Sequence, residues 1–215
     1  MGRYKCVIFD LDGTIADTKK GIINGYKYAA AEMGFKYLKA YDNDIIGPSL
    51  YDSFTRFYKF SHDRAKAAVE LYRKYYIDKG YLEYNLYDGV RELIINLKNS
   101  GLSVALATTK YKNFAELMLK NSKIYEYFTC VAGSNADGSL SGKKELLQYV
   151  MNKTGYASAD CVMVGDRFYD AAGANEVGMD FIRAGFGYGN DEEFAGYKVY
   201  FTAKSANDIF KIVIN

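Results

Sequence analysis

Residues 6–14 read CVIFDLDGT, an apolar run followed directly by two carboxylates two positions apart. The run Cys6–Phe9 is apolar without interruption, which is typical of a strand buried on both faces of a parallel sheet. Asp10 and Asp12 follow at the carboxyl end of this strand, the edge at which open α/β folds bind ligands. Gly13 permits a tight turn or a close approach of the backbone. Asp-Gly alone is common in turns, but the whole pattern is far more specific for a site.

Further apolar runs alternate with helical patterns along the rest of the chain. We expect Asp88 and Ser205 to cap helices and Gly101 to end one. Strand and helix in alternation predict a doubly wound α/β domain with a parallel sheet. The expected strands are residues 102–107, 161–164 and 181–184, with weaker candidates at 128–132 and 198–201, and a further helix is expected at 143–153.

The stretch from residue 16 to residue 85 breaks this alternation because its pattern is helical throughout. Ser61 is expected to start one of its helices and Gly80 to end that helix. Much of the chain's excess of Tyr, 22 in all, lies here. We expect these tyrosines to pack amphipathically with their hydroxyls in water, a ligand-facing aromatic wall being the alternative. The predicted domains are an α/β core of residues 1–15 and 86–215 and an inserted helical domain of residues 16–85.

Composition excludes several kinds of chemistry. The chain has 215 residues, a net charge of +2 and a single histidine, His62, which we expect at the surface. Multi-His metal sites are therefore excluded. The small net charge argues against binding to nucleic acid or to a membrane. The sequence has no apolar run of 18 residues and no signal peptide, and its three Cys form no CxxC motif, so we expect a cytoplasmic protein.

Polar side chains also stand where other predicted elements begin or end. Thr108 follows one apolar run, Asp166 follows another, and Asp170 lies one helical turn after Asp166. Lys143 opens a helix, where its charge opposes the helix dipole, so another reason for its position is indicated. Each of these residues alone would fit a helix cap or a surface charge. Together with the two carboxylates after the first strand, they indicate one site at the edge of the sheet.

With these residues the chain resembles the haloacid dehalogenase-like hydrolase superfamily, in particular its phosphatases with a helical cap inserted after the first motif. The resemblance extends over essentially the whole chain, and its four motifs occur in order. It implies a Rossmannoid core, a parallel sheet between helices, with an inserted α-helical cap domain. The segments that carry it are DLDGT at 10–14, ALATTK at 105–110, SGKKE at 141–145 and GDRFYD at 165–170, supported by residues 45–54, 87–94 and 185–189.

The resemblance implies nucleophilic catalysis by a carboxylate. Asp10 attacks phosphorus to form an aspartyl-phosphate, and Asp12 protonates the leaving oxygen and later accepts a proton from water. Mg²⁺ is held by the Asp10 carboxylate, the backbone carbonyl of Asp12 and Asp166. An anionic nucleophile that approaches a dianionic phosphate requires such positive charge. The presence of Asp12 disfavours the dehalogenase branch of the superfamily, which lacks it.

The other motif residues are implied in support of this reaction. Thr108 donates a hydrogen bond to a phosphoryl oxygen, and Lys143 neutralises charge between the phosphoryl group and the nucleophile. The helical register favours Lys143 for this role, with the adjacent Lys144 as the alternative. Asp170 supports either a metal-bound water or the lysine. Two further supporting residues are Gly13 and Thr109, the latter standing where many relatives carry Asn or Ser.

The inserted domain is implied to close over the site as a lid that excludes water and contacts the organic part of the substrate. Lys19, Tyr51 and Arg56 are candidate substrate contacts, although each also fits a solvated helix face.

The sequence thus predicts a Mg²⁺-dependent phosphatase that acts on a small-molecule phosphate monoester, such as phosphoglycolate, a nucleotide or a sugar phosphate. The alternatives are a phosphosugar mutase of the same superfamily, a receiver-like protein that carries a phosphorylated Asp, and a catalytically silent scaffold. The identity of the substrate stays open, as does the choice between a monomer and a homodimer.

Overall fold

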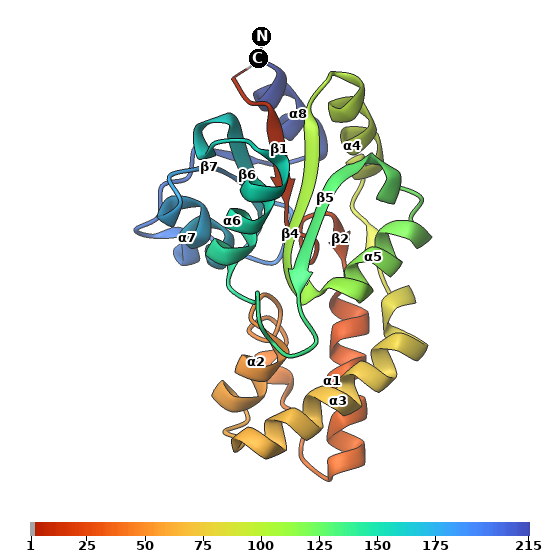
Figure 1. Ribbon diagram of the computed structural model, residues 1–215. Coiled ribbons are helices and arrows are strands. Elements are labelled where there is room, and N and C mark those ends of the chain that lie inside the picture. The colour runs from red at the N-terminus through yellow and green to blue at the C-terminus, as the bar shows by residue number, and fades with distance from the viewer. Residues whose placement is uncertain (1–2) are drawn as a thin grey trace. The chain divides into compact units, whose positions relative to one another are not determined.

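The computed structural model describes residues 3–215 (Figure 1). The chain divides into two compact units, which are described separately. The core unit consists of Met1–Asp17 and Leu86–Asn215, and the helical unit is Thr18–Asn85. The sequence predicts these boundaries at residues 15–16 and 85–86. Within residues 3–215, no helix has both the length and the apolar character needed to span a membrane.

The core unit is built on a six-stranded parallel sheet in the order β5-β4-β1-β6-β7-β8. All four residues of β1 are buried, which explains why its sequence is apolar without alternation. The predicted α/β fold class is therefore confirmed. The strands are β1 (Cys6–Phe9), β4 (Ser103–Tyr111), β5 (Phe128–Ser134), β6 (Cys161–Gly165), β7 (Asp180–Ala184) and β8 (Phe201–Ala203).

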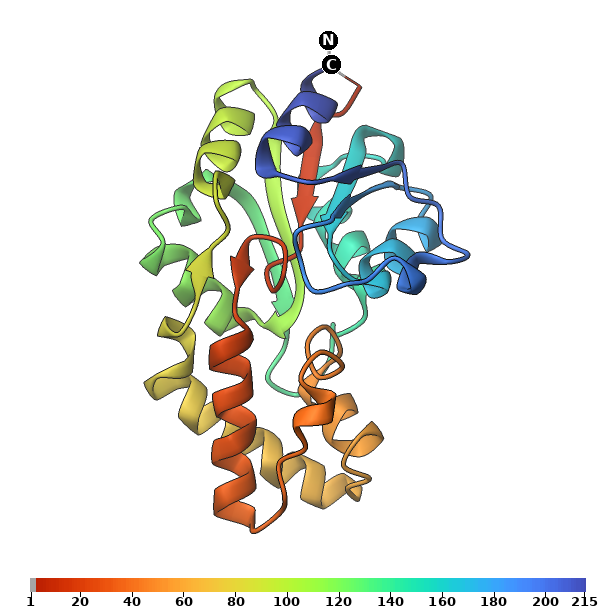
Figure 2. The same ribbon diagram turned by 180° about the vertical axis from the view of Figure 1, so that it is seen from behind.

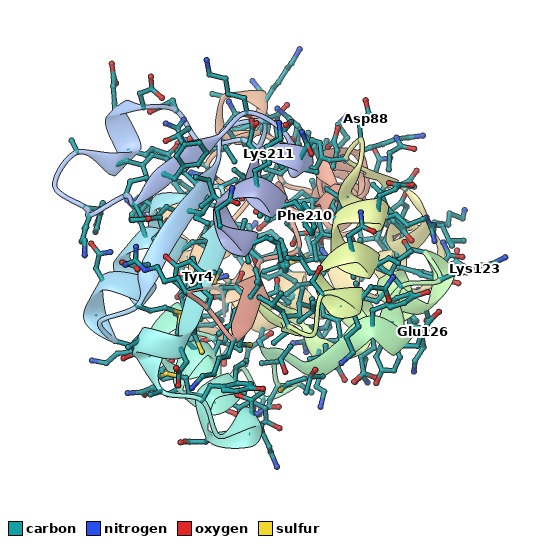
Figure 3. The ribbon with its side chains drawn as sticks, turned by 90° about the horizontal axis from the view of Figure 1, so that it is seen from above. Tyr4, Asp88, Lys123, Glu126, Phe210 and Lys211 are labelled. Atoms are coloured by element: carbon teal, nitrogen blue, oxygen red, sulfur yellow. The ribbon has the colours of Figure 1, made fainter. Side chains whose placement is uncertain are left out.

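Helices cover both faces of this sheet, as the two opposite views show (Figure 1, Figure 2). On one face, α8 packs against α4, and α5 packs on β4 and β5. On the other face, α6 and α7 pack against each other, α6 also packs on β4 and β5, and α7 packs on β6 and β7. Figure 3 looks onto the end of the core unit where β1 begins, with Tyr4 before that strand and Phe210 on α8. The helices are α4 (Val90–Asn99), α5 (Lys112–Asn121), α6 (Lys143–Thr154), α7 (Phe168–Glu176) and α8 (Ala206–Ile214).

The helical unit contains three α-helices, α1 (Lys19–Met33), α2 (Leu50–Arg56) and α3 (His62–Asp78). Gly34 ends α1 in the left-handed conformation, with φ of 66°, and Ser61 caps α3 through its side chain, as expected. The short strands β2 (Ala16–Asp17) and β3 (Asn85–Leu86) pair where the chain passes between the units. Single 3₁₀ turns complete the structure: η1 (Lys39–Tyr41), η2 (Gly80–Leu82), η3 (Tyr125–Tyr127), η4 (Ser158–Asp160) and η5 (Glu192–Phe194).

Aromatic side chains form the core of the helical unit. The ring of Tyr26 is fully buried, with its centroid 4.8 Å from that of Phe54 and 5.4 Å from that of Tyr72. Tyr76 is also fully buried and stacks on Tyr72. The expectation that the tyrosine hydroxyls reach water is therefore wrong for Tyr26 and Tyr76. Burial accordingly raises the pKa of Tyr26 above the ordinary value for a phenol.

Two details of the core unit differ from the prediction. Helix α4 is preceded by Gly89 in the left-handed conformation, with φ of 76°, and Asp88 does not cap it. The last strand, β8, begins at Phe201 and so shares only the final residue of the predicted 198–201, because both backbone groups of Lys198 are bound by the side chain of Asn175. Its side chain accepts from the Lys198 N–H at 2.7 Å and donates to the Lys198 carbonyl at 3.0 Å, so neither group is left for a strand ladder.

Candidate active site

The carboxyl ends of three neighbouring strands carry the predicted site residues. Strand β1 lies between β4 and β6, and Phe9 is level with Leu106 on one side and with Val164 on the other. The next residue along β1, Asp10, therefore lies in the same layer as the ends of its two neighbours. Asp10, Thr108 and Asp166 are all buried.

Lys143 is a buried cation in contact with two of the carboxylates. It is the first residue of α6, and its Nζ lies 3.0 Å from Asp10 Oδ1 and 2.7 Å from Asp170 Oδ1. The same nitrogen donates a hydrogen bond of 2.8 Å to the carbonyl of Ala107. Lys144 instead has a half-exposed side chain that pairs with Glu176 at 3.3 Å. The structure therefore places Lys143, and not Lys144, beside the carboxylates.

Burial and the proximity of these charged groups shift the pKa values of Asp10 and Lys143. Burial raises the pKa of Asp10, the attraction of Lys143 opposes this, and Asp170 and Asp12 add to the rise, so that the pKa reaches about 6. Burial alone would lower the pKa of Lys143, but the combined attraction of Asp10 and Asp170 outweighs it and raises that pKa. Lys143 is therefore a protonated ammonium group throughout the physiological range.

Asp166 is held by groups from two other segments. Its Oδ1 accepts a hydrogen bond from Thr14 Oγ1 at 3.2 Å, and its Oδ2 accepts one from the backbone N–H of Tyr188 at 2.8 Å. Burial, together with the charges of Asp170 and Asp10, raises the pKa of Asp166 well above its ordinary value. Neither Thr14 nor Tyr188 was expected from the motifs as a partner of Asp166.

A divalent cation fits the donor set at the centre of the site. Asp10, Asp166 and Asp170 are buried and can each offer one oxygen, and these three oxygens lie within 4.8 Å of one another. Oδ1 of Asp10 and Oδ1 of Asp170 are close to Lys143 but accept no well-formed hydrogen bond. Carboxylate oxygens are the ligands that Mg²⁺ prefers. The set predicted from sequence shares Asp10 and Asp166 with this cluster and adds the backbone carbonyl of Asp12.

The side chain of Asp12 faces a lysine that sequence reasoning missed. Nζ of Lys110 lies 2.9 Å from Asp12 Oδ1 and 3.1 Å from Asp12 Oδ2. Lys110 lies two positions after Thr108 on β4, and alternation along a strand puts both side chains on one face. This spacing places Lys110 near Thr108 at the strand end but does not by itself predict the contact with Asp12. Thr109, between them, is half-buried.

Gly13 allows the loop after β1 to lie against Asp166. Its φ is 82°, and a Cβ atom added to it would lie 2.1 Å from Asp166 Oδ2. Its N–H donates to the carbonyl of Ala16 at 2.9 Å, which closes a tight turn. A side chain at this position would therefore displace a carboxylate of the candidate metal cluster.

Gly13→Ala is expected to lower the turnover number by about 10²-fold, because displacing a catalytic group by about 1 Å has an effect of that size. The matched control is Gly138→Ala, at φ of 85° with no atom within 4 Å of the added Cβ. Both variants should lose about 1 kcal/mol of unfolding free energy through left-handed strain. Steady-state kinetics and urea unfolding measure the two effects. Equal activity losses in the two variants would contradict a specific role of Gly13 beside Asp166.

The candidate substrate contacts of the helical unit have partners within that unit. Nζ of Lys19 donates to Asn43 Oδ1 at 2.7 Å, and the hydroxyl of Tyr51 lies 2.7 Å from Nδ1 of His62. His62 is exposed, as expected. Arg56 is exposed too, with its guanidinium 5.4 Å from the ring centroid of Phe57.

A parallel sheet with four carboxylates and two lysines gathered at its carboxyl edge defines an α/β enzyme that works with acidic side chains. The sequence pattern of the haloacid dehalogenase-like hydrolase family matches residues 7–184, and the chain belongs to this family.

Relatives and solved structures agree with this assignment. A protein named 5'-nucleotidase from Pseudomonas aeruginosa is 33% identical over 197 residues, which cover 91% of this chain and 89% of the relative. A protein named phosphoglycolate phosphatase from Vibrio parahaemolyticus is 26% identical and covers 97% of this chain and 96% of its own length. The crystal structure of a predicted phosphatase from Clostridium acetobutylicum superposes with a TM-score of 0.92 at 33% identity, covering 97% of each chain.

Proposed function

We propose that this phosphatase hydrolyses a small-molecule phosphate monoester through an aspartyl-phosphate on Asp10, with Mg²⁺ as its metal ion. The observation that carries the proposal is the buried contact of Asp10 with Lys143, beside Asp166 and Asp170. A buried carboxylate next to a permanent cation is suited to nucleophilic attack on an anionic ester. The names of the relatives, a 5'-nucleotidase and a phosphoglycolate phosphatase, support hydrolysis of small phosphate esters.

The proposed reaction has two displacements at phosphorus. In the first, an oxygen of Asp10 forms a bond to phosphorus while the ester P–O bond breaks, and Asp12 gives its proton to the leaving oxygen. In the second, water attacks the same phosphorus, its proton passes to Asp12, and the carboxylate of Asp10 leaves. Thr108 donates a hydrogen bond to a phosphoryl oxygen, and Lys143 offsets the negative charge between the phosphoryl group and Asp10.

The charges of the site support the choice of a divalent cation. Four carboxyl groups face two ammonium groups, so the acidic groups outnumber the cations before any substrate binds. Asp10 and Asp166, assisted by the Asp12 carbonyl or by Asp170, would hold the ion. Mg²⁺ would supply additional positive charge and help to align the phosphoryl group. The four carboxylates are Asp10, Asp12, Asp166 and Asp170, and the two lysines are Lys110 and Lys143.

The helical unit is proposed to supply contacts to the organic part of the substrate, with Lys19, Tyr51 and Arg56 as the first candidates. Relatives of this chain carry the names of enzymes for different phosphate esters, so the substrate is proposed here only as a class. The family match over residues 7–184 disfavours the receiver-like alternative, and the mutase alternative predicts a different product.

Hydrolysis of a panel of phosphate esters tests the proposal. The panel contains p-nitrophenyl phosphate, phosphoglycolate, nucleoside monophosphates and sugar phosphates, each with Mg²⁺ or with EDTA. We expect release of inorganic phosphate from at least one ester, and a loss of about 10²-fold or more in EDTA, because the metal offsets developing charge. Equal rates in both buffers would contradict the metal requirement. Transfer of the phosphoryl group to a second sugar hydroxyl without release of phosphate would identify a mutase.

A further inference from the structure

Lys110 is a buried lysine whose burial needs an explanation. It lies near the end of β4 (Ser103–Tyr111), and its side chain is only 6% exposed. Lysine is rarely buried unless its charge is paired. The charge of Lys110 is paired with Asp12, whose side chain is 12% exposed. Because both side chains are largely withdrawn from water, this pair is screened far less than a surface ion pair.

The contact between Lys110 and Asp12 involves both carboxylate oxygens. Nζ lies 2.9 Å from Oδ1 and 3.1 Å from Oδ2, so the ammonium group can donate to each of them. A cation placed between the two oxygens limits rotation of the carboxylate, whereas a contact with one oxygen leaves the other free to turn. The orientation of Asp12 is therefore set by a residue that lies 98 positions away in the sequence.

The two buried lysines serve different carboxylates. Lys143 contacts Asp10 and Asp170, and its third contact is the carbonyl of Ala107. Lys110 contacts the side chain of Asp12. The candidate nucleophile and the candidate acid–base group thus have separate cations. This division suggests a separate task for Lys110, because charge neutralisation around Asp10 is already supplied by Lys143.

The end of β4 also fixes the backbone position from which the Lys110 side chain extends. The backbone N–H of Lys110 donates to Thr108 Oγ1 at 3.2 Å, within the segment where the pairing of β4 with β5 shifts register between Thr108 and Tyr111. Thr108, the proposed donor to the phosphoryl group, and Lys110 are therefore held together. The same strand end therefore positions Thr108 for the phosphoryl group and Lys110 for the carboxyl group of Asp12.

We propose that Lys110 is a positioning residue that holds the Asp12 carboxyl group in the orientation required for both proton transfers, an assignment that rests on the proposed phosphatase function. In the first displacement the proton of Asp12 passes to the leaving oxygen, and the resulting carboxylate lies beside the ammonium group. In the second displacement this oriented carboxylate accepts the proton of the attacking water. Lys110 itself neither gains nor loses a proton in either step.

The assignment is tested by measuring how the variant Lys110→Met hydrolyses two esters that differ in their leaving group. An alkyl phosphate needs protonation of its leaving oxygen, whereas p-nitrophenyl phosphate needs little. We expect kcat for the alkyl ester to fall by about 10²-fold and kcat for the aryl ester by less than about tenfold, because general acid–base catalysis contributes on this scale. KM should change little for either ester. Lys112→Met is the matched control, since Lys112 is 40% exposed and 3.9 Å from Glu116, and it should leave both rates unchanged.

A double-mutant cycle separates positioning from a structural effect. In the background of Asp12→Asn, adding Lys110→Met should change kcat for the alkyl ester by less than about threefold, because the two residues act as one unit. The double variant carries neither charge of this ion pair, so it leaves neither partner of the pair unpaired and should fold.

Three results would overturn the assignment: equal losses for both esters, additive effects in the cycle, or a rise in KM with kcat unchanged, which would make Lys110 a substrate ligand. A failure of the unaltered chain to hydrolyse any ester is a different result, since it would refute the proposed function and this assignment with it.

Discussion

Asp10→Asn is expected to lower kcat for p-nitrophenyl phosphate with Mg²⁺ by about 10⁴-fold or more, the scale on which loss of a nucleophile acts in other enzymes. The amide has nearly the shape of the carboxylate, so the packing at the end of β1 should persist. It carries no charge, however, and cannot form the phosphoryl bond. Stopped reactions followed by mass spectrometry should show a phosphorylated peptide containing residue 10 in the unaltered chain and none in the variant.

The fold should survive this substitution. Burial raises the pKa of Asp10 to about 6, so its ionised form still predominates at neutral pH but is destabilised in the folded state relative to the unfolded chain. Loss of this charge should therefore leave the melting temperature in EDTA unchanged or slightly higher. Asp137→Asn, in an exposed loop where Asp137 accepts from the N–H of Ser139, is the matched control and should keep full activity. Activity close to that of the unaltered chain in Asp10→Asn would exclude Asp10 as the nucleophile.

Lys143→Met is expected to lower kcat by about 10²–10³-fold, because a preorganised cation or donor at a developing charge contributes on that scale. It should also destabilise the protein by about 3–5 kcal/mol at pH 8, since it leaves the carboxylates of Asp10 and Asp170 without their buried partner. Lys144→Met removes the neighbouring lysine, which is half exposed, and should change the unfolding free energy by less than about 0.5 kcal/mol.

The destabilisation of Lys143→Met should depend on pH in a defined direction. Lys143 opposes the rise in the pKa of Asp10, so its removal moves that pKa further above 6. A carboxyl group with a raised pKa in the folded state stabilises the fold at low pH and loses this contribution as the pH rises through the folded value. Lys143 itself adds no slope there, because its pKa is raised from an ordinary value of 10.5.

Urea unfolding in EDTA from pH 5 to pH 8 measures this dependence. The unfolding free energy of Lys143→Met should fall more steeply with rising pH than that of the unaltered chain. The combined variant Asp10→Asn/Lys143→Met should regain part of the loss at pH 8, since one of the uncompensated carboxylates is gone. Parallel pH profiles for all three proteins would show that Asp10 and Lys143 are not coupled.

Much of the fold follows from local pattern. The run Cys6–Phe9 was expected as a strand and forms β1 with the same bounds, because four buried apolar residues before a polar turn suit a central parallel strand. Ser205 caps α8 as expected, since capping depends only on neighbouring backbone. The last strand begins at Phe201 and not at the predicted residue 198, where Asn175, 23 positions earlier, binds the backbone of Lys198. Local pattern contains no information about such a contact.

The sequence by itself determined which residue types stand at the ends of the strands. Asp10 and Asp12 follow an apolar run, and parallel strands place their carboxyl ends at one edge, so a carboxylate site could be predicted without coordinates. Alternation also puts Thr108 and Lys110 on one face of their strand, although the consequence for Asp12 cannot be seen from that spacing alone.

Only the tertiary structure decided which charge faces which. It places β1 between β4 and β6, brings Lys143 between Asp10 and Asp170, and turns the Asp12 side chain to Lys110. Strand propensity and side-chain alternation act over a few residues, whereas these pairings join residues about 30 to 130 positions apart through the order of the sheet and the packing of α6. The chain's composition supplies the charges, and the packing of the core assigns their partners.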